Sequence, residues 1–501
     1  MAQALNILLL ADDRHPANSI QDHVQAYRRY SRHHWVVLNP IYNRICPLLD
    51  FKRFDAVAIH YSLCVVYDYY LPPRVRQKIR DFKGPKFQFI QDEYRWVDRT
   101  SAVVADLGID TLFTLVRQDL VERAYSDPRL KHVRKVSVLP GYVPEDLVRY
   151  PAGPIVDRRL HIAYRGRRLP YWLGALAQDK VRIAEGVSAR AARHGLCIDV
   201  SADEEDRIYG PRWIGFICSA KAVLGTEGGA SIWDFQSQAQ RAVEGYLETH
   251  PEADFEEVSG AVLRPFESNL MYNTISPRLF EAAALRTAMV MFPGWYNGVV
   301  EPHDHYIPLE KDFSNIAEVA DKLHDDAFLQ RMVDRTFDDI VRSQRYSKRA
   351  FIEAIDRFIE ESAGAWRPVD LHESFRGAGS RVNIESQIRL VMALERWFAG
   401  PVAIGLRGTE FLHKLREVLF DPRFPRAENR RRARRLLGRA IRLAVQEIAW
   451  VYPRLRMRAV RDRVLKILKR VYGRYPVIWP AWRALRGPWR RVRGHSAVAS
   501  E

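Results

Sequence analysis

Apolar and polar positions follow two alternating patterns over the first 150 residues of the chain. Short apolar runs bounded by turn residues are typical of buried strands, and segments with apolar residues every three or four positions are typical of helices. Strands separated by helices predict a parallel sheet with helices on both faces. The strand-like runs are LNILLLADD, WVVLNP, FDAVAIHYS and KFQFIQDEY, and the helical segments include SIQDHVQAYRRYSRHH and VRQKIRDF.

A stretch with several prolines and glycines, LPGYVPEDLVRYPAGPIVDRR, interrupts this pattern and indicates a linker. A second alternation follows, with the strand-like runs LHIAYRGR, CIDVS and AKAVLGTEGG and the helical segment KVRIAEGVSARAARHG, and from about residue 314 the pattern is helical. We therefore expect an α/β protein with two Rossmann-like domains, at residues 1–150 and 151–365. Two such domains would face a cleft, which is a favoured place for a ligand.

Chemically capable side chains follow the strands of the first half. In parallel sheets ligands bind at the carboxyl ends of the strands, and His60, Asp92 and Glu93 stand at two such ends. These groups could orient or deprotonate an acceptor hydroxyl, so we take them as the catalytic candidates. A single strand-end histidine also fits a structural role, whereas two adjacent carboxylates beside aromatic residues suit a sugar-binding wall.

The segment ISPRLFEAAAL in the second half predicts a helix that starts at a defined point. Ser276 is a good N-cap and Pro277 a good first helical residue. The first-turn amides and the positive end of the helix dipole would then face the carboxyl edge of the sheet and could hold a phosphate or diphosphate, with Arg278 adding a charged contact. Glu281 could accept hydrogen bonds from a ribose diol. A capped amphipathic helix with a surface arginine and glutamate fits the same segment.

This segment resembles the donor-nucleotide site of GT-B glycosyltransferases, in particular the group-1-like enzymes with an S-x-R-x-F-E-A-x-A helix. The matching positions are Ser276, Arg278, Phe280, Glu281, Ala282 and Ala284. The resemblance covers roughly residues 1 to 360. It implies that Glu281 contacts the ribose and that the helix start binds the diphosphate. Two positions differ from the family pattern: Asn273 stands where many retaining relatives carry a second glutamate, and a usual glycine is replaced around Arg286.

The loops after the first and third strands of the second half supply further binding candidates. Relatives place an arginine and a lysine after the first of these strands, and here Arg165, Arg167 and Lys180 are candidates to neutralise a leaving diphosphate. A solvated basic loop fits each of them about equally well. In LGTEGGASIWDF, Gly228 and Gly229 would let the backbone approach a ligand, and a tight strand-to-helix turn would use them too.

We expect no metal and no cofactor beyond the nucleotide-sugar co-substrate. The chain has no DxD in the loop context of metal-dependent transferases, and His303, Asp304 and His305 are too closely spaced to coordinate an ion from one face.

Positive charge is concentrated at the C-terminus. The net charge is +17, and residues 401–501 hold 26 Lys and Arg against 7 Asp and Glu. The segment RMRAVRDRVLKILKRVYG has apolar residues at helical spacing with basic residues between them, and tryptophans and tyrosines punctuate the same region. We expect a basic helical extension at 366–501 in which 423–493 contacts an anionic membrane surface. A helical bundle packed on the body fits almost as well, and no nucleic-acid module motif is found, so no nucleic-acid partner is expected.

The expected function is transfer of a sugar from a nucleotide-diphosphate donor to a hydroxyl acceptor, such as a glycan or a lipid-linked precursor. No apolar run is long enough for a transmembrane helix or a signal peptide, so we expect a cytoplasmic protein, peripheral at the inner face of the membrane. Two alternatives stay open. One is a catalytically silent GT-B-like scaffold recruited to membranes or partners, which Asn273 favours. The other is a sugar-nucleotide epimerase on the same fold.

Overall fold

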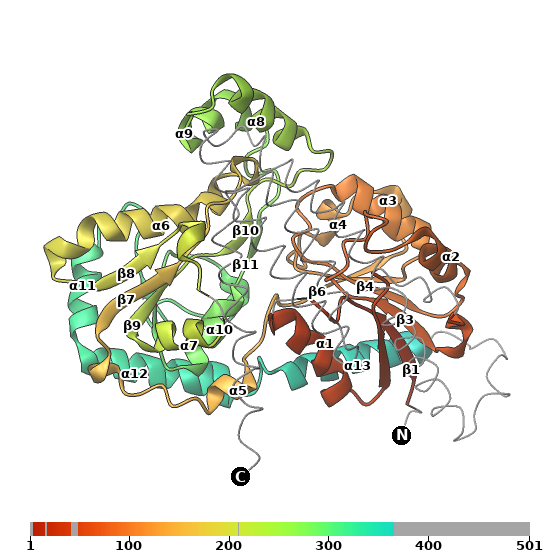
Figure 1. The fold of residues 1–501 in the computed structure, drawn as a ribbon, viewed down its shortest axis with the longest axis horizontal. Coiled ribbons are helices and arrows are strands. Elements are labelled where there is room, and N and C mark those ends of the chain that lie inside the picture. Colours follow the sequence, from red (N-terminus) through yellow and green to blue (C-terminus); the bar gives the residue numbers. More distant parts are fainter. Residues whose placement is uncertain (1–3, 16–17, 42–48, 209, 365–501) are drawn as a thin grey trace, which may run out of the picture. The chain divides into compact units, whose positions relative to one another are not determined.

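The structure is a computed structural model that describes residues 4–15, 18–41, 49–208 and 210–364 (Figure 1). Within this part of the chain, all residues except Leu247–Ala253 belong to one compact unit. The expected extension at 366–501, with its proposed membrane segment 423–493, lies outside the described residues. None of the described helices is long and apolar enough to cross a membrane.

The first half is a parallel sheet of strands in the order β2-β1-β3-β4-β5-β6. Its strands are mostly buried along their length because helices and loops cover both faces, as a parallel sheet requires. The strands are β1 (Asn6–Leu10), β2 (His34–Leu38), β3 (Ala56–Ile59), β4 (Lys86–Phe89), β5 (Thr111–Thr114) and β6 (Arg134–Ser137). The helices are α1 (Asn18–Tyr30), α2 (Pro73–Asp81), α3 (Val97–Leu107), α4 (Val121–Ala124) and α5 (Glu145–Val148), with 3₁₀ turns at Phe51–Arg53, Pro128–Leu130 and Ile155–Asp157.

The second half is a parallel sheet in the order β13-β12-β9-β7-β8. Its strands are β7 (Leu160–Arg165), β8 (Ile198–Ser201), β9 (Ala220–Gly225), β12 (Ala288–Met291) and β13 (Ile307–Pro308). Its helices are α6 (Ala175–Ala191), α7 (Pro211–Cys218), α10 (Pro277–Ala284), α11 (Ile316–His324) and α12 (Asp326–Thr336). Short 3₁₀ turns lie at Tyr171–Leu173, Ala192–His194, Glu204–Asp206 and Tyr296–Gly298, and a π turn at Phe337–Arg342 follows α12.

Both sheets have the same doubly wound order. In each, the first strand lies between the second and the third strand of that half, so the chain reverses direction across the sheet at this point. The expected α/β class with two Rossmann-like sheets is therefore confirmed. A ligand is expected just outside the carboxyl ends of the strands at that reversal.

A segment inserted between β9 and α10 is an addition to the second sheet. It contains β10 (Gly228–Ala230) and β11 (Tyr272–Thr274), which pair antiparallel, with α8 (Gln238–Thr249), α9 (Phe255–Val258) and a π turn (Ser259–Leu263) between them. The fully buried Trp233 in this segment donates from Nε1 to the carbonyl of Ala124 in the first half, 3.2 Å away. The insertion therefore contacts both halves of the unit.

The last described helix, α13 (Lys348–Gly364), packs against the first half although it follows the second half in the chain. Phe351, Ile352 and Ile355 are buried in the same apolar cluster as residues of α1, β1 and β3. Asp356 is completely buried and accepts from the Ser31 hydroxyl at 2.6 Å and the Arg32 amide at 2.7 Å. Our boundary at 365 assigned this helix by chain order to the second half, but its buried face belongs to the core of the first.

Candidate functional site

In the second sheet, the chain reverses its direction across the sheet between β7 and β9. Two loops and the start of one helix meet there at the carboxyl edge of the strands. β7 and β9 are neighbours, and the loops that follow them diverge because β8 and β12 lie on opposite sides. The loop after β7 carries Arg167 and leads into α6, and β9 leads into Glu227. Helix α10 precedes β12, so its start faces the same carboxyl edge.

Helix α10 begins where the sequence predicts. Ser276 has extended backbone angles, φ −80° and ψ 136°, and Pro277 is the first helical residue. The Ser276 hydroxyl, however, makes no capping hydrogen bond, so the first turn lacks the side-chain acceptor that usually satisfies its amides. The uncapped positive end of the helix dipole is a ready place for an anion.

Glu281 lies one turn further along α10 and is partly held by a tryptophan. Trp213 on α7 donates from Nε1 to Glu281 Oε2 at 2.8 Å, and the guanidinium of Arg278 lies 4.9 Å from the centre of the Trp213 ring. Burial raises the pKa of Glu281, and the Trp213 hydrogen bond and the charge of Arg278 oppose that rise. Glu281 Oε1 has no hydrogen-bond partner within the described part of the chain and can accept from a ligand hydroxyl.

Three cations gather beside this helix start. Burial lowers the pKa of the half-buried Lys180 to about 8, with further lowering by the charges of Arg167 and Arg278 and an opposing effect of Asp92. Neither Lys180 nor the exposed Arg167 forms a hydrogen bond or a close ion pair with another described residue. The neighbouring positive charges that lower the pKa of Lys180 favour an added anion, since an anion would relieve the repulsion between them.

Arg165 differs from Lys180 and Arg167 because its guanidinium is already engaged, as is that of Arg278, which donates to the Arg165 carbonyl. Arg165 donates to the carbonyls of Asp206, Tyr164 and Asp199 and, at 2.7 Å, to the Asp199 carboxylate. Its role on a diphosphate stays a prediction, and the structure brings Arg167, Lys180 and Arg278 together more directly.

Gly228 and Gly229 lie in a strand rather than in the expected strand-to-helix turn. They belong to β10 and pair with Thr274 and Asn273 of β11. Gly229 has φ +120°, and a Cβ there would lie 1.8 Å from the carbonyl oxygen of Tyr272. Glycine is therefore required for close strand pairing, a reason that local sequence does not reveal.

Glu227, which lies beside the two glycines and for which the sequence leaves a site role open, organises the loop after β12. Its Oε1 accepts from Asn273 Nδ2 at 2.8 Å and from the amides of Trp295 and Tyr296 at 2.8 and 3.3 Å. The amide group of Asn273 is thereby oriented so that its Oδ1 is buried without a hydrogen-bond partner among the described residues. Trp213, by contrast, was missed by the sequence analysis, since no local pattern links it to Glu281.

In the first half, His60 is completely buried in a hydrogen-bonded chain. Its Nδ1 accepts from the Ser62 amide at 3.0 Å, so its Nε2 carries the proton and faces His23 Nδ1 at 2.8 Å. Burial lowers the pKa of His60 well below its ordinary value and that of His23 to about 3. Both imidazoles are neutral at pH 7, and His60 fits the structural role rather than that of a base in contact with substrate.

The loop after β4 separates the two acidic candidates. Asp92 is exposed and has a left-handed backbone with φ +52°, and Trp96 at the other end of the loop has φ +55°. Glu93 between them is buried and accepts from Thr114 Oγ1 at 2.5 Å, from the Leu115 amide at 2.8 Å and from the Tyr125 hydroxyl. Each left-handed residue costs roughly 1–2 kcal/mol, and the Glu93 anchor helps to hold both in place.

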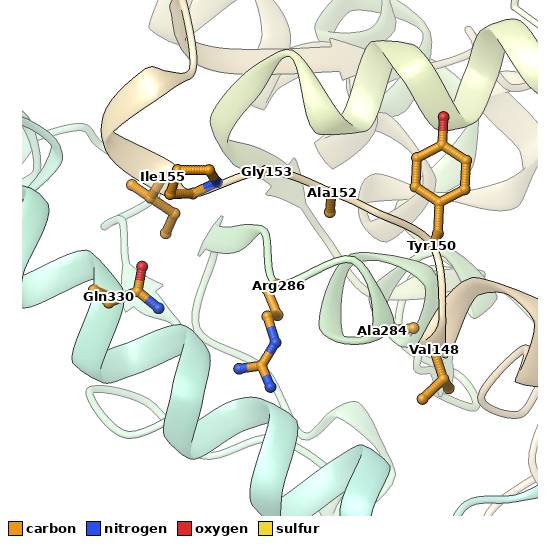
Figure 2. A pocket seen from close by; sticks show the side chains of 9 residues that line it. Val148, Tyr150, Ala152, Gly153, Ile155, Ala284, Arg286 and Gln330 are labelled. Carbon is orange, nitrogen blue, oxygen red and sulfur yellow. The ribbon is translucent and has the colours of Figure 1, made fainter.

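A pocket of the described surface lies beside the last residue of α10 (Figure 2). It has a volume of about 350 Å³ and is lined by Val148, Tyr150, Ala152, Gly153, Pro154, Ile155, Ala284, Arg286 and Gln330. Ala284 is the last residue of α10, so the pocket is at the opposite end of the helix from Ser276. No group of three His, Cys, Asp or Glu among the described residues is arranged to hold a metal ion.

No family model matches the chain, and no curated protein matches it. Several solved structures align with it at low identity. An alpha-glucosyltransferase in complex with UDP-glucose and DNA containing an abasic site has 9% identity and a TM-score of 0.40, covering 71% of this chain and 99% of that chain. Anabaena HepE in complex with UDP-glucose has 12% identity and a TM-score of 0.36, covering 72% and 100%. TarM has 10% identity and a TM-score of 0.35, covering 62% and 57%. Similarity at this level assigns no activity and no ligand to this chain.

Proposed function

We propose that the protein is a glycosyltransferase that takes a sugar from a nucleoside-diphosphate donor and transfers it to a hydroxyl acceptor. The observation that carries the proposal is the group of Arg167, Lys180 and Arg278 beside the uncapped start of α10. These cations meet at the carboxyl edge of a doubly wound sheet, where a phosphate-bearing ligand is expected.

Three parts of a nucleotide sugar, namely the diphosphate, the ribose and the sugar, have candidate partners at this edge. The diphosphate would lie against Lys180, Arg167 and the first turn of α10. The ribose hydroxyls would donate to Glu281 Oε1, since Trp213 occupies the other oxygen. A sugar hydroxyl could donate to the unpartnered Oδ1 of Asn273, whose burial without a partner otherwise costs about 1–3 kcal/mol.

The proposed reaction develops negative charge on the departing diphosphate and releases a proton from the acceptor. The bond between the anomeric carbon and the diphosphate oxygen breaks, the acceptor oxygen bonds to that carbon, and the acceptor proton must leave. Fixed cations stabilise the negative charge that grows on the departing diphosphate. Asp92 is the exposed carboxylate whose charge opposes the lowering of the Lys180 pKa, and this supports a role for Asp92 as the base that takes the acceptor proton.

A thermal-shift screen against UDP, GDP, ADP, CMP and their sugar conjugates tests the donor site, because a ligand that binds only the folded state raises its stability. We expect one nucleoside diphosphate to stabilise the protein selectively. Lys180→Gln and Glu281→Ala should each weaken its binding by about tenfold or more, the loss of a hydrogen bond to a charged group. The matched control is Arg168→Gln, because Arg168 is exposed next to Arg167 but pairs with Glu185 at 2.7 Å.

The pH dependence gives a second readout of the same site. Lys180 loses its proton near pH 8, so nucleotide affinity should fall as pH rises from 7 to 9, and Lys180→Arg should remove most of that fall because arginine stays charged. If folded protein shows no shift with any nucleotide, the donor assignment is wrong and the catalytically silent scaffold becomes the better account.

We also propose, from sequence alone, that residues 423–493 hold the enzyme on an anionic membrane surface where lipid-linked acceptors are displayed. Each basic residue near such a surface contributes on the order of 1 kcal/mol, and salt weakens the attraction. The full chain should sediment with vesicles containing phosphatidylserine and not with pure phosphatidylcholine vesicles. Equal binding to both would contradict the electrostatic account.

A further inference from the structure

Aromatic side chains gather at the carboxyl edge of the first sheet, and the donor site does not use them. Tyr67 lies in the loop after β3 and is 40% exposed. Trp96 ends the loop after β4, and its ring lies edge-to-face with that of Tyr67, with centroids 5.3 Å apart. Since β3 and β4 are parallel neighbours, both loops leave the sheet at the same edge.

The Trp96 ring packs against Arg95, and the guanidinium carbon of Arg99 lies 5.8 Å from its centre. The guanidinium carbon of Arg95 lies 3.7 Å from the centre of the Trp96 ring, and Arg95 Nε donates to Gln240 Oε1 at 2.9 Å. The left-handed backbone of Trp96 persists in a loop that Glu93 anchors to Leu115. Strained residues that the surrounding structure holds in place are concentrated at ligand sites, because pre-organisation lowers the entropy lost on binding.

The charge of the same edge argues against a polyanionic ligand. Apart from the buried Glu93, whose pKa is raised to about 7, the described loops after β1, β3, β4 and β5 contain five acidic residues and three arginines; these are Asp12, Asp13, Asp68, Asp92 and Asp119 with Arg14, Arg95 and Arg117. A nucleic acid is bound largely through cations that neutralise its phosphates, and an edge with excess carboxylates repels it. An uncharged ligand rich in hydroxyls meets no such repulsion, and carboxylates accept its hydrogen bonds.

We propose that this edge binds the acceptor as a neutral saccharide, with the apolar face of a sugar ring against Tyr67 and Trp96 and its hydroxyls within reach of Asp92. A pyranose ring presents C–H groups on its face and hydroxyls at its rim, which matches aromatic side chains bordered by polar groups. This inference rests on the proposed function, since it names the acceptor class of that reaction. It also places the acceptor hydroxyl near Asp92, the carboxylate that couples to Lys180.

The test uses the full chain on an array of defined neutral and acidic oligosaccharides, with single-stranded DNA and RNA oligonucleotides on the same surface. We expect neutral saccharides to bind, and Tyr67→Ala to weaken that binding by about tenfold, the value of a lost aromatic contact. Tyr67→Phe should bind normally because it keeps the ring. Tyr150→Ala is the matched control, since Tyr150 is 42% exposed and lines the pocket of Figure 2.

A second variant, Trp96→Gly, tests the same aromatic pair in case Tyr67→Ala does not fold. Trp96→Gly removes the ring at a left-handed position that glycine adopts freely, so the loop can keep its path, and the same loss of saccharide binding is expected. Each variant must keep the nucleotide-induced thermal shift of the wild type.

Three results would overturn the inference: saccharide binding that Tyr67→Ala and Trp96→Gly leave unchanged, oligonucleotide binding that these changes abolish, or no saccharide bound by protein that still binds its nucleotide. Saccharide binding through Tyr67 in a protein that binds no nucleotide would instead contradict the proposed function and the acceptor role, and would support only a saccharide-binding site at this edge.

Discussion

Burial in a loop shifts the pKa of Glu93 away from the value of a glutamate in solution. Glu93 is 4% exposed, and burial raises its pKa from 4.5 to about 7 against the opposing hydrogen bonds of Thr114, Tyr125 and the Leu115 amide. The folded protein therefore holds this proton at a pH where the unfolded chain has released it. Burying an ionisable group of this kind costs stability in return for a firmly anchored loop.

This predicts a specific loss of stability with rising pH. Below pH 4.5 the Glu93 carboxyl is protonated in both the folded and the unfolded state and does not change the free energy of unfolding. Between pH 4.5 and about 7 the free energy of unfolding falls, because the unfolded state loses this proton first. Above pH 7 the full cost, on the order of 3 kcal/mol, is present. Glu93→Gln resembles the protonated form and lacks that loss. Relative to wild type, it should therefore be more stable at pH 8 than at pH 5 by about that amount, measured by urea unfolding.

Asp92→Asn is the control for Glu93→Gln, because Asp92 is the exposed carboxylate in the same loop. It should keep the pH dependence that Glu93 contributes to the wild type. Parallel pH profiles for wild type and Glu93→Gln would show that Glu93 does not titrate near pH 7.

At the scale of elements, the pairing of β10 with β11 supports the donor side of the molecule. β11 runs directly into Ser276 and α10, and its Asn273 contacts Glu227, which in turn holds the loop after β12. The position of the helix start thus depends on a short antiparallel pair in an insertion, and this pair depends on a single glycine.

Gly229→Ala should break this arrangement. Its Cβ would meet the Tyr272 carbonyl oxygen at 1.8 Å, and its φ of +120° is unsuitable for alanine, so we expect a loss on the order of 3 kcal/mol in unfolding free energy. Nucleotide affinity should fall as well, because α10 follows β11. Gly228→Ala is the matched control: its nearest neighbour would be Thr274 O at 3.6 Å, an ordinary contact, and it should be tolerated. Equal stability of the two variants would refute the requirement for close pairing at Gly229.

At the scale of the described molecule, α13 links the end of the second half to the core of the first. Its apolar residues complete the cluster around β1 and β3. Asp356 anchors the helix by accepting hydrogen bonds from Ser31 and Arg32, which directly follow α1. Phe358 also stacks edge-on against Phe113 of β5 at 5.2 Å. The core of the first half is therefore incomplete without α13, which lies more than three hundred residues after β1 in the chain.

Replacing Asp356 tests this link. Asp356→Ala should destabilise the protein by about 3 kcal/mol, because it leaves the Ser31 hydroxyl and the Arg32 amide without their buried acceptor. Limited proteolysis should show faster cleavage near α13. Asp338→Ala is the matched control, since its ion pair with Arg342 is exposed and should contribute less than about 1 kcal/mol. Similar losses in both variants would contradict a special role for the α13 anchor.

Local sequence was sufficient for features that depend on neighbours in the chain. Strand and helix periodicity predicted two parallel sheets, and the Ser276–Pro277 pair predicted where α10 begins, since backbone preferences act over a few residues. The same local reasoning read a turn at Gly228 and Gly229, whereas both lie in a strand pair, and close pairing requires glycine only at Gly229.

Contacts between distant residues were decided only by the tertiary structure. Trp213 reaches Glu281 across 68 positions of the chain, Asn273 is oriented by Glu227, and Lys180 owes its lowered pKa to burial and to Arg167 and Arg278. The sequence favoured the acidic pair Asp92 and Glu93 over His60 as a ligand-contacting group, yet folding buried both His60 and Glu93 and left only Asp92 exposed. By itself, the sequence determined which segments become strands and helices, because periodicity is local. Which side chains share an environment, and therefore which carry charge or accept a ligand, was decided by packing, because burial and electrostatic fields come from residues that only the fold brings together.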